Sequence, residues 1–231
     1  MTSGRADARA VVLAILEQGG VGPGPAARLE PALDSALGHL TAALGTRVGA
    51  VYVDDRGSRG LLLRSRRPAE SAAEEPVAAT IGRRRTPGLV AALRAGREVD
   101  DRSPAGAELD LVGLGGGLLV PARVGDATVA ALGVAFPPGH HPVAEDRSTV
   151  RAVAQVMALW VHNARLVAGM RDRVRELDRQ SLQLAALTRV ARRVAATLDE
   201  DEAHRVVASE ARALARADAA ALVAREGPDG T

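Results

Sequence analysis

Apolar residues recur three and four positions apart over residues 26–44, which predicts a helix with one apolar face formed by Leu29, Leu33, Leu37, Leu40 and Leu44. Gly45 ends this helix in the prediction. A shorter helix is predicted over residues 5–18. Gly and Pro fill most of residues 19–25, and both interrupt helices, so residues 1–25 form an N-terminal helix and linker in this interpretation.

Two pairs of apolar runs predict β-hairpins. Residues 48–53 and 61–65 are separated by an Asp-Asp-Arg-Gly turn, and residues 117–124 and 128–136 are separated by Gly125-Asp126. Between the hairpins, Thr86-Pro87 is typical of an N-cap residue followed by Pro at the first position of a helix. That helix is predicted to cover residues 88–95 and to end at Gly96, before a short extended segment at residues 97–101.

A long helix is predicted over residues 144–198, which contain no Pro and only one Gly, at Gly169. Its apolar positions follow a heptad for about 30 residues, long enough to predict a two-stranded coiled coil. Arg173 and Asp178 could pair across a parallel dimer, and a stammer-type phase slip follows Leu184. The alternative is one helix packed on its own sheet, and the part before Leu166 could do both. The predicted interface residues are Val153, Val156, Trp160, Asn163, Val167, Met170, Val174 and Leu177.

The order of segments from residue 118 onward resembles the GAF family. Leu-Leu-Val-Pro-Ala-Arg-Val precedes a Gly turn and Ala-Ala-Leu-Gly-Val-Ala-Phe, and then Asp146 opens a helix that reaches His-Asn-Ala-Arg-Leu at residues 162–166. Residues 96–101 and 48–55 resemble earlier parts of the same family. The resemblance implies a GAF-like sensor domain over residues 26–166. Its expected α+β sandwich has about six antiparallel strands, helices on one face and a ligand pocket on the other.

A weak internal repeat extends the resemblance. Shifting the chain by 170 positions aligns Leu44 with Leu214 and Val53 with Val223. Residues 199–231 therefore resemble the start of a second GAF-like domain, a helix leading into a strand at residues 219–224. Residues 167–198 become the linker helix, and the chain is interpreted as a fragment of a longer signalling protein. A C-terminal helix and tail of a complete protein is the alternative.

The amino-acid composition excludes several kinds of site and ligand. The chain has no Cys, which excludes disulfides, thiolate metal sites, cysteine nucleophiles and the covalent bilin attachment or sulfoxide reduction of some GAF relatives. It also has no Lys, which the Asn-Lys signature of cyclic-nucleotide-binding GAF domains requires. The net charge is +2, and the Arg residues are interspersed with acids, so direct nucleic-acid binding is not expected. No apolar run is long enough for a membrane helix, so we expect a cytoplasmic location.

Few residues suggest a site. The glycine-rich run at residues 113–117 precedes a strand, the reverse of a phosphate-binding loop, and we expect a turn that could line a pocket edge. Gly115, Gly116, Asp100 and Asp101 are the candidate pocket-edge residues, although both aspartates also suit turns. His140-His141 is interpreted as a solvated turn, and His162 as a surface or interface residue. No catalytic constellation, metal site or cofactor is predicted.

The sequence therefore predicts a bacterial regulatory module without enzymatic activity. In this hypothesis it binds an unidentified small molecule, forms a homodimer through flanking helices and relays a change to a downstream effector domain outside the chain. The alternative is a ligand-free GAF dimerisation or spacer module of a histidine kinase, phosphatase or transcription regulator.

Overall fold

The computed structural model describes residues 8–18, 29–55, 60–67, 77–195, 200–215 and 219. The chain divides into two units, Met1–Ala168 and Gly169–Thr231. Among the described residues, the first unit contains the sheet and four complete helices, and α5 (Ala144–Ala195) continues from it into the second unit. The second unit also contains α6 (Glu200–Ala215).

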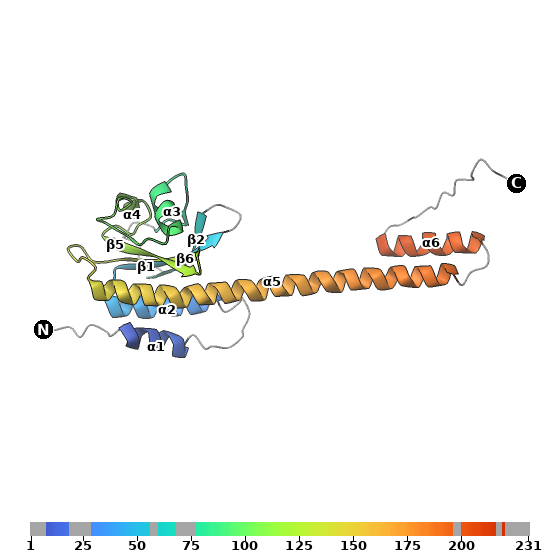
Figure 1. The fold of residues 1–231 in the computed structure, drawn as a ribbon, viewed down its shortest axis with the longest axis horizontal. Coiled ribbons are helices and arrows are strands. Elements are labelled where there is room, and N and C mark those ends of the chain that lie inside the picture. The colour runs from blue at the N-terminus through green and yellow to red at the C-terminus, as the bar shows by residue number, and fades with distance from the viewer. Residues whose placement is uncertain are drawn as a thin grey trace. The chain divides into compact units, whose positions relative to one another are not determined.

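The first unit is built on a six-stranded antiparallel sheet in the order β3-β2-β1-β6-β5-β4 (Figure 1). Both predicted hairpins are present, β1–β2 and β5–β6, and the second turns at Gly125-Asp126 as expected. The predicted α+β class and strand number are therefore confirmed. The strands are β1 (Val48–Asp55), β2 (Gly60–Arg67), β3 (Thr80–Ile81), β4 (Val99–Asp100), β5 (Gly117–Val124) and β6 (Ala127–Ala135).

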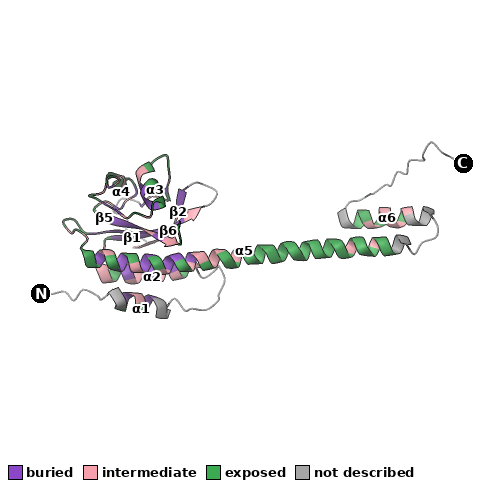
Figure 2. Ribbon diagram, in the orientation of Figure 1, coloured by how far each residue is buried: buried purple, intermediate pink, exposed green. Residues whose placement is uncertain are grey.

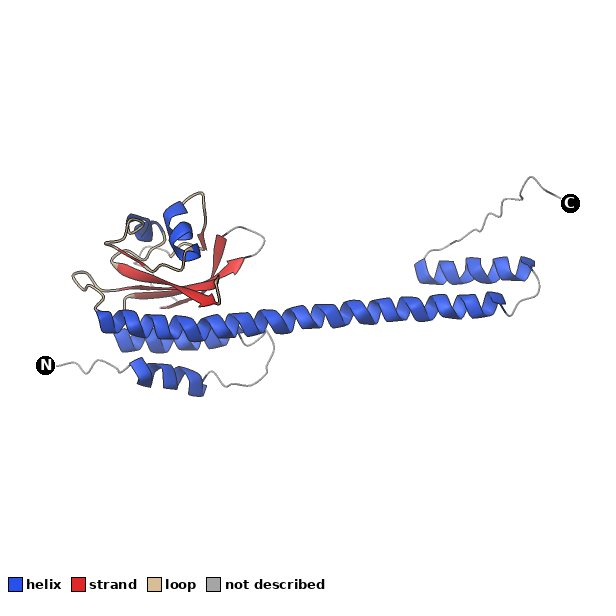
Figure 3. Ribbon diagram, in the orientation of Figure 1, coloured by secondary structure: helices blue, strands red, loops and turns tan. Residues whose placement is uncertain are grey.

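Helices cover both faces of this sheet (Figure 3). The helices α1 (Ala8–Gln18), α2 (Leu29–Leu44) and the first part of α5 lie on one face. The helices α3 (Pro87–Arg94) and α4 (Ala107–Leu111) lie on the other. Successive side chains of a strand point to opposite faces, so Val51 and Val53 join the first core while Ala50 and Tyr52 join the second. The central strands are buried on both sides and read as apolar runs (Figure 2).

The start of α3 has the predicted backbone but a different cap. Pro87 occupies the first turn as expected, yet the Thr86 side chain makes no capping hydrogen bond and instead bonds to Gly82. The free amides of Gly88 and Leu89 donate to the two carboxylate oxygens of Glu108 in α4, at 3.0 and 2.8 Å. A residue twenty positions away therefore caps α3, which no local sequence pattern predicts.

Three further expectations can be compared with the structure. The helix α5 begins at Ala144 as predicted and is continuous through Ala195, while the predicted last residues, 196–198, lie outside the described residues. The predicted helix after residue 199 is present as α6. Of the predicted strand at residues 219–224, only residue 219 is described, and it belongs to no strand. The short elements β3 and α4 were not predicted.

Candidate functional site

The space between the sheet and the α3–α4 layer is filled by the chain's own side chains. Leu89 and Leu93 of α3, Leu109 of α4 and Leu114 are each 1% exposed or less. Gly133 of β6 allows this packing, because a Cβ there would lie 2.4 Å from Leu114 Cδ1. The sheet face on which the family resemblance implies a ligand pocket thus holds an aliphatic core.

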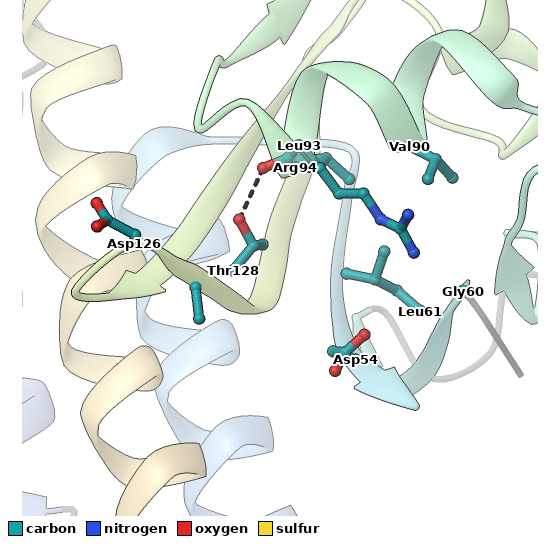
Figure 4. A pocket seen from close by; sticks show the side chains of 9 residues that line it. Asp54, Gly60, Leu61, Val90, Leu93, Arg94, Asp126 and Thr128 are labelled. Carbon is teal, nitrogen blue, oxygen red and sulfur yellow. Dashed lines mark hydrogen bonds between the residues drawn. The ribbon is translucent and has the colours of Figure 1, made fainter. Parts of the chain in front are cut away.

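A cleft of about 210 Å³ opens beside this core instead, at the rim of the first unit (Figure 4). The C-terminal half of α3 forms one wall, and the ends of the two hairpins form the others. Its apolar surface comes from Leu61, Val90, Leu93 and Ala127, and its polar surface from Asp54, Arg94, Asp126 and Thr128, with Gly60 at the edge.

The charged groups of the cleft are not paired with one another. Arg94 is exposed, and within the described part of the chain it takes part in no ion pair. Its guanidinium and the Asp54 carboxylate point into the cleft on either side of Leu61 (Figure 4). Thr128 is already engaged, because its hydroxyl donates a 2.7 Å hydrogen bond to the carbonyl of Leu93 at the end of α3. The Asp126 side chain is fully in solvent and lies 3.6 Å from Arg123.

Asp54 also connects the cleft to α5. The guanidinium of Arg165 donates a hydrogen bond to the Asp54 carbonyl, and Arg165 Nη2 lies 3.9 Å from Asp54 Oδ2. Both side chains are partly shielded, with 25% of Arg165 and 34% of Asp54 exposed. A change at the Asp54 carboxylate therefore acts directly on a residue of α5.

The two predicted pocket aspartates lie elsewhere. Asp100 lies in β4 and is buried, where its carboxylate accepts from Ser103 Oγ at 2.6 Å and from the guanidinium of Arg147. Asp101 lies 3.5 Å from His141 Nδ1. Asp100 is a turn residue as predicted, since its Oδ1 accepts from Arg102 N at 3.2 Å and its carbonyl accepts from Ser103 N at 3.0 Å. Its carboxylate also anchors the start of α5 and does not line the cleft.

Asp100 shares Arg147 with Glu98, whose Oε1 accepts from Arg147 Nη1 at 2.8 Å and whose Oε2 accepts from Arg151 at 2.8 Å. Partial burial by itself would raise the pKa of both carboxyls. Hydrogen bonds outweigh this effect of burial. Asp100 accepts them from Ser103 and Arg147, and Glu98 accepts them from Arg151 and Arg147. The pKa values of both carboxyls therefore lie below their ordinary range. These ion pairs join the β4 segment to the start of α5.

Gly115 and Gly116 also lie outside the cleft. They belong to the turn that precedes β5, where Gly113 and Gly116 adopt positive φ angles of 72° and 66°. Such backbone favours glycine because other residues are strained there. The glycine-rich run is therefore explained by turn geometry, as the sequence indicated.

The predicted dimer residues differ sharply in burial. Val153 is wholly buried in the first core, so it has no surface to offer a partner. Val156 and Trp160 are partly buried against that core, and Asn163 is exposed. The remaining four residues expose between 37% and 64% of their surface, namely Val167, Met170, Val174 and Leu177.

The histidines of the Pro-rich turn have structural partners. The His140 ring stacks on Phe136 with centroids 4.7 Å apart, and its Nε2 lies 3.3 Å from Asp146 near the start of α5. Among the described residues, no three His, Asp or Glu side chains are grouped so as to hold a metal ion. No described helix is long and apolar enough to cross a membrane.

Sequence reasoning did not identify the cleft residues. Asp54 was interpreted as a turn residue, and Arg94 and Thr128 were not singled out. Their positions in sequence carry no shared motif, because the cleft forms only where α3 meets the ends of two hairpins. A charged residue at the end of an otherwise apolar helix, as Arg94 is, is the one available signal.

The order of strands and the two helix layers can be compared with solved structures. Residues of this chain superpose on a domain from a phosphoenolpyruvate-protein phosphotransferase of Coxiella burnetii, described as a GAF domain, with a TM-score of 0.56 and 15% identity. The match covers 72% of this chain and 99% of that one. The fold is that of a GAF domain.

Two further GAF-fold comparisons span different activities. The phycocyanobilin-bound GAF domain of a cyanobacterial phytochrome matches with a TM-score of 0.54 and 11% identity, over 70% of this chain and 97% of that one. A free methionine-R-sulfoxide reductase from Neisseria meningitidis, in complex with its substrate, matches with a TM-score of 0.55 and 16% identity, over 72% and 95%. No family model and no curated protein matches the sequence. At these identities the GAF fold is shared, and function has to be argued from this chain's own residues.

Proposed function

We propose that this chain is a non-enzymatic regulatory module of a signalling protein, in which a GAF-fold unit forms a homodimer through α5 and passes a change to an effector domain. The observation that carries the proposal is an apolar stripe on α5 that no other described residue of the chain covers. This stripe consists of Val167, Met170, Val174, Leu177 and Leu184, and each exposes at least 37% of its surface.

The spacing of the stripe indicates its partner. From Val167 to Leu177 its residues alternate at three and four positions, which is the spacing of a and d positions in a two-stranded coiled coil. Leu184 follows Leu177 by one heptad, with the polar Ser181 at the a position between them. Helix packing within a globular fold uses a broader face. Arg173 and Asp178 occupy the flanking g and e positions of successive heptads, where opposite charges attract in a parallel pair. A second copy of this chain therefore supplies a matching surface.

The stripe and the sheet-facing residues of α5 lie on different sides of the helix. At about 100° per residue, the stripe lies roughly 160° around the helix from the buried residues Ala154, Met157 and Val161. A partner helix could bind the stripe while the protomer keeps its core intact. Asn163, exposed at a d position, could set the register of such a pair.

A ligand-free spacer is the second candidate function, and one observation favours it. The interior between the sheet and α3–α4 is filled by Leu89, Leu93, Leu109 and Leu114. A module without a ligand would still dimerise and set the spacing of its neighbours. The two candidates therefore agree on the dimer and differ on whether any small molecule binds.

Cysteine cross-linking tests the dimer, because the chain has no native Cys. Under mild oxidation, Val174→Cys should form a disulfide-linked dimer rapidly, since identical a positions face each other in a parallel coiled coil. Asp172→Cys is the matched control, because residue 172 occupies an outward f position and is exposed. It should cross-link much more slowly.

The mass of the uncross-linked chain, measured by light scattering, gives a second readout. The double variant Val174→Glu/Leu177→Glu removes four apolar side chains per dimer, about 6 kcal/mol or more, which raises the dimer dissociation constant by roughly four orders of magnitude. Arg179→Glu, at an outward f position, should leave the mass unchanged. A monomeric wild-type chain at high concentration, or equal cross-linking of both cysteine variants, would refute the proposal.

A further inference from the structure

We infer that the cleft beside α3 binds a small zwitterion of amino-acid size, with its carboxylate at Arg94 and its ammonium group at Asp54, and that occupancy weakens the Asp54–Arg165 contact to α5. The regulatory part of this inference rests on the proposed function, while the binding part does not. The inference specifies the chemical class of a ligand that the sequence analysis leaves unidentified.

The charges of the cleft define the ligand. Arg94 is a cation without an ion-pair partner in the described part of the chain, and Asp54 is an anion on the other side of Leu61 (Figure 4). A molecule with one charge could engage only one of these groups, because Asp54 repels an anion and Arg94 repels a cation. A molecule that carries both charges a short distance apart matches the two together.

The size and walls of the cleft limit the body of the ligand. Pockets for drug-sized molecules measure roughly 300–1,000 Å³, and this cleft measures about 210 Å³. Leu61, Val90 and Leu93 provide apolar surface between the two charged groups. A short aliphatic side chain could cover that surface, which favours a small apolar amino acid over a nucleotide or a sugar phosphate.

Binding at Asp54 has a direct route to α5. Arg165 and a ligand ammonium would share one carboxylate, whose distance to Arg165 Nη2 is already 3.9 Å. Each cation weakens the attraction of the other, so the coupling between ligand and Arg165 is negative and reciprocal. Arg165 occupies an f position, away from the proposed dimer stripe, so α5 can respond without breaking the dimer.

Isothermal titration calorimetry of the full chain tests the ligand class, with each standard L-amino acid as the probe at neutral pH and low ionic strength. For the amino acid that binds most tightly, the analogues lacking the amino group or the carboxyl group should each bind about tenfold or more weakly. Two variants then assign the groups. Arg94→Gln should remove the advantage conferred by the carboxylate, and Asp54→Asn should remove the advantage conferred by the ammonium group.

Arg97→Gln is the matched control, since Arg97 is also exposed, follows the same helix and does not line the cleft. It should bind like the wild type. No binding by the wild-type chain, or binding that neither Arg94→Gln nor Asp54→Asn alters, would overturn the assignment of the site. Either result leaves the dimer of the proposed function untouched, because that dimer is measured without ligand.

The link to α5 has its own test. Arg165→Gln removes the competing cation and should tighten amino-acid binding about two- to fivefold, as expected for a partly exposed ion pair. Bound amino acid should change the cross-linking rate of Val174→Cys when Arg165 is present and leave it unchanged when Arg165→Gln is added. Weaker or equal binding by Arg165→Gln, or a ligand effect that persists in it, would contradict the coupling.

Discussion

Two segments of α5 place similar apolar residues in opposite environments. Across residues 150–161, the apolar side chains that face the sheet are buried, with Val150, Val153 and Met157 at 0% exposure. Across residues 167–177, the large apolar side chains are exposed, and Met170 and Leu177 reach 64% and 63%. Both segments belong to one helix and continue one heptad count.

The difference lies in spacing and surroundings. The buried segment presents a face several residues wide, which fits against a sheet. The exposed segment presents a narrow a/d stripe, which fits a second helix. An apolar helix face therefore indicates that another element packs on it. The width of the face indicates whether that element is a sheet or a second helix.

The strongest test uses the two methionines of α5. Met157→Asp places a charge without a partner in a fully buried position, which should cost more than about 4 kcal/mol and unfold much of the first unit. Met170→Asp changes an exposed position and should alter unfolding by less than about 0.5 kcal/mol when the chain is monomeric. Urea unfolding followed by the fluorescence of Trp160, the only Trp, measures both.

The same pair separates folding from dimerisation. Met170→Asp should weaken the dimer in light scattering although it leaves the unfolding midpoint of dilute protein in place. If Met157→Asp and Met170→Asp destabilised the dilute chain equally, the exposed segment would be part of the protomer's own core and the contrast would fail.

An intermediate effect is expected from the ion pairs of the two segments. Arg147 is 25% exposed and bonds to Glu98 and Asp100, so Arg147→Gln should cost about 1–3 kcal/mol. Arg179 is 72% exposed and pairs with Glu176 at 3.1 Å, so Arg179→Gln should cost at most about 0.5 kcal/mol. Chemical denaturation at neutral pH compares the two. Equal losses would show that burial does not distinguish the two sets of pairs.

The Arg147 effect should depend on pH. The pKa values of Glu98 and Asp100 are lowered in the folded chain, so their contribution is fully present above the unfolded values near 4 and is lost as pH falls through the folded values. The stability gap between wild type and Arg147→Gln should therefore shrink between neutral pH and about pH 3. A gap that widened in acid would contradict the ion-pair explanation.

The smallest effect concerns Gly169, at the junction of the two segments. A Cβ added there meets no atom within 4 Å, and glycine is a poor helix former. Gly169→Ala should raise helix stability by about 0.5–1 kcal/mol, visible in thermal melts by far-UV circular dichroism. Residue 169 is at an outward c position, so the dimer should be unaffected. A destabilised dimer would place Gly169 in a close helix contact and move the proposed stripe.

Local patterns predicted the elements that depend on neighbours in sequence. The β5–β6 hairpin followed from Gly125-Asp126 between two apolar runs, and α2 from its leucines. The start of α5 at Ala144 was also correct. The cap of α3 was not, because Glu108 reaches Gly88 and Leu89 only after α4 has packed beside α3. The ion pair of Asp100 was not predicted for the same reason, since its partner Arg147 is 47 residues away.

The sequence by itself determined the antiparallel hairpins, the long α5 and the stripe of Val167, Met170, Val174 and Leu177, because turns and helical periodicity depend on residues close together in the chain. Only the tertiary structure decided that Val153 is core and that Leu114 fills the space over Gly133. The tertiary structure alone also brought Asp54 and Arg94 to the same cleft and Arg165 into contact with Asp54. These outcomes depend on distances between segments far apart in sequence, which packing sets and no local pattern records.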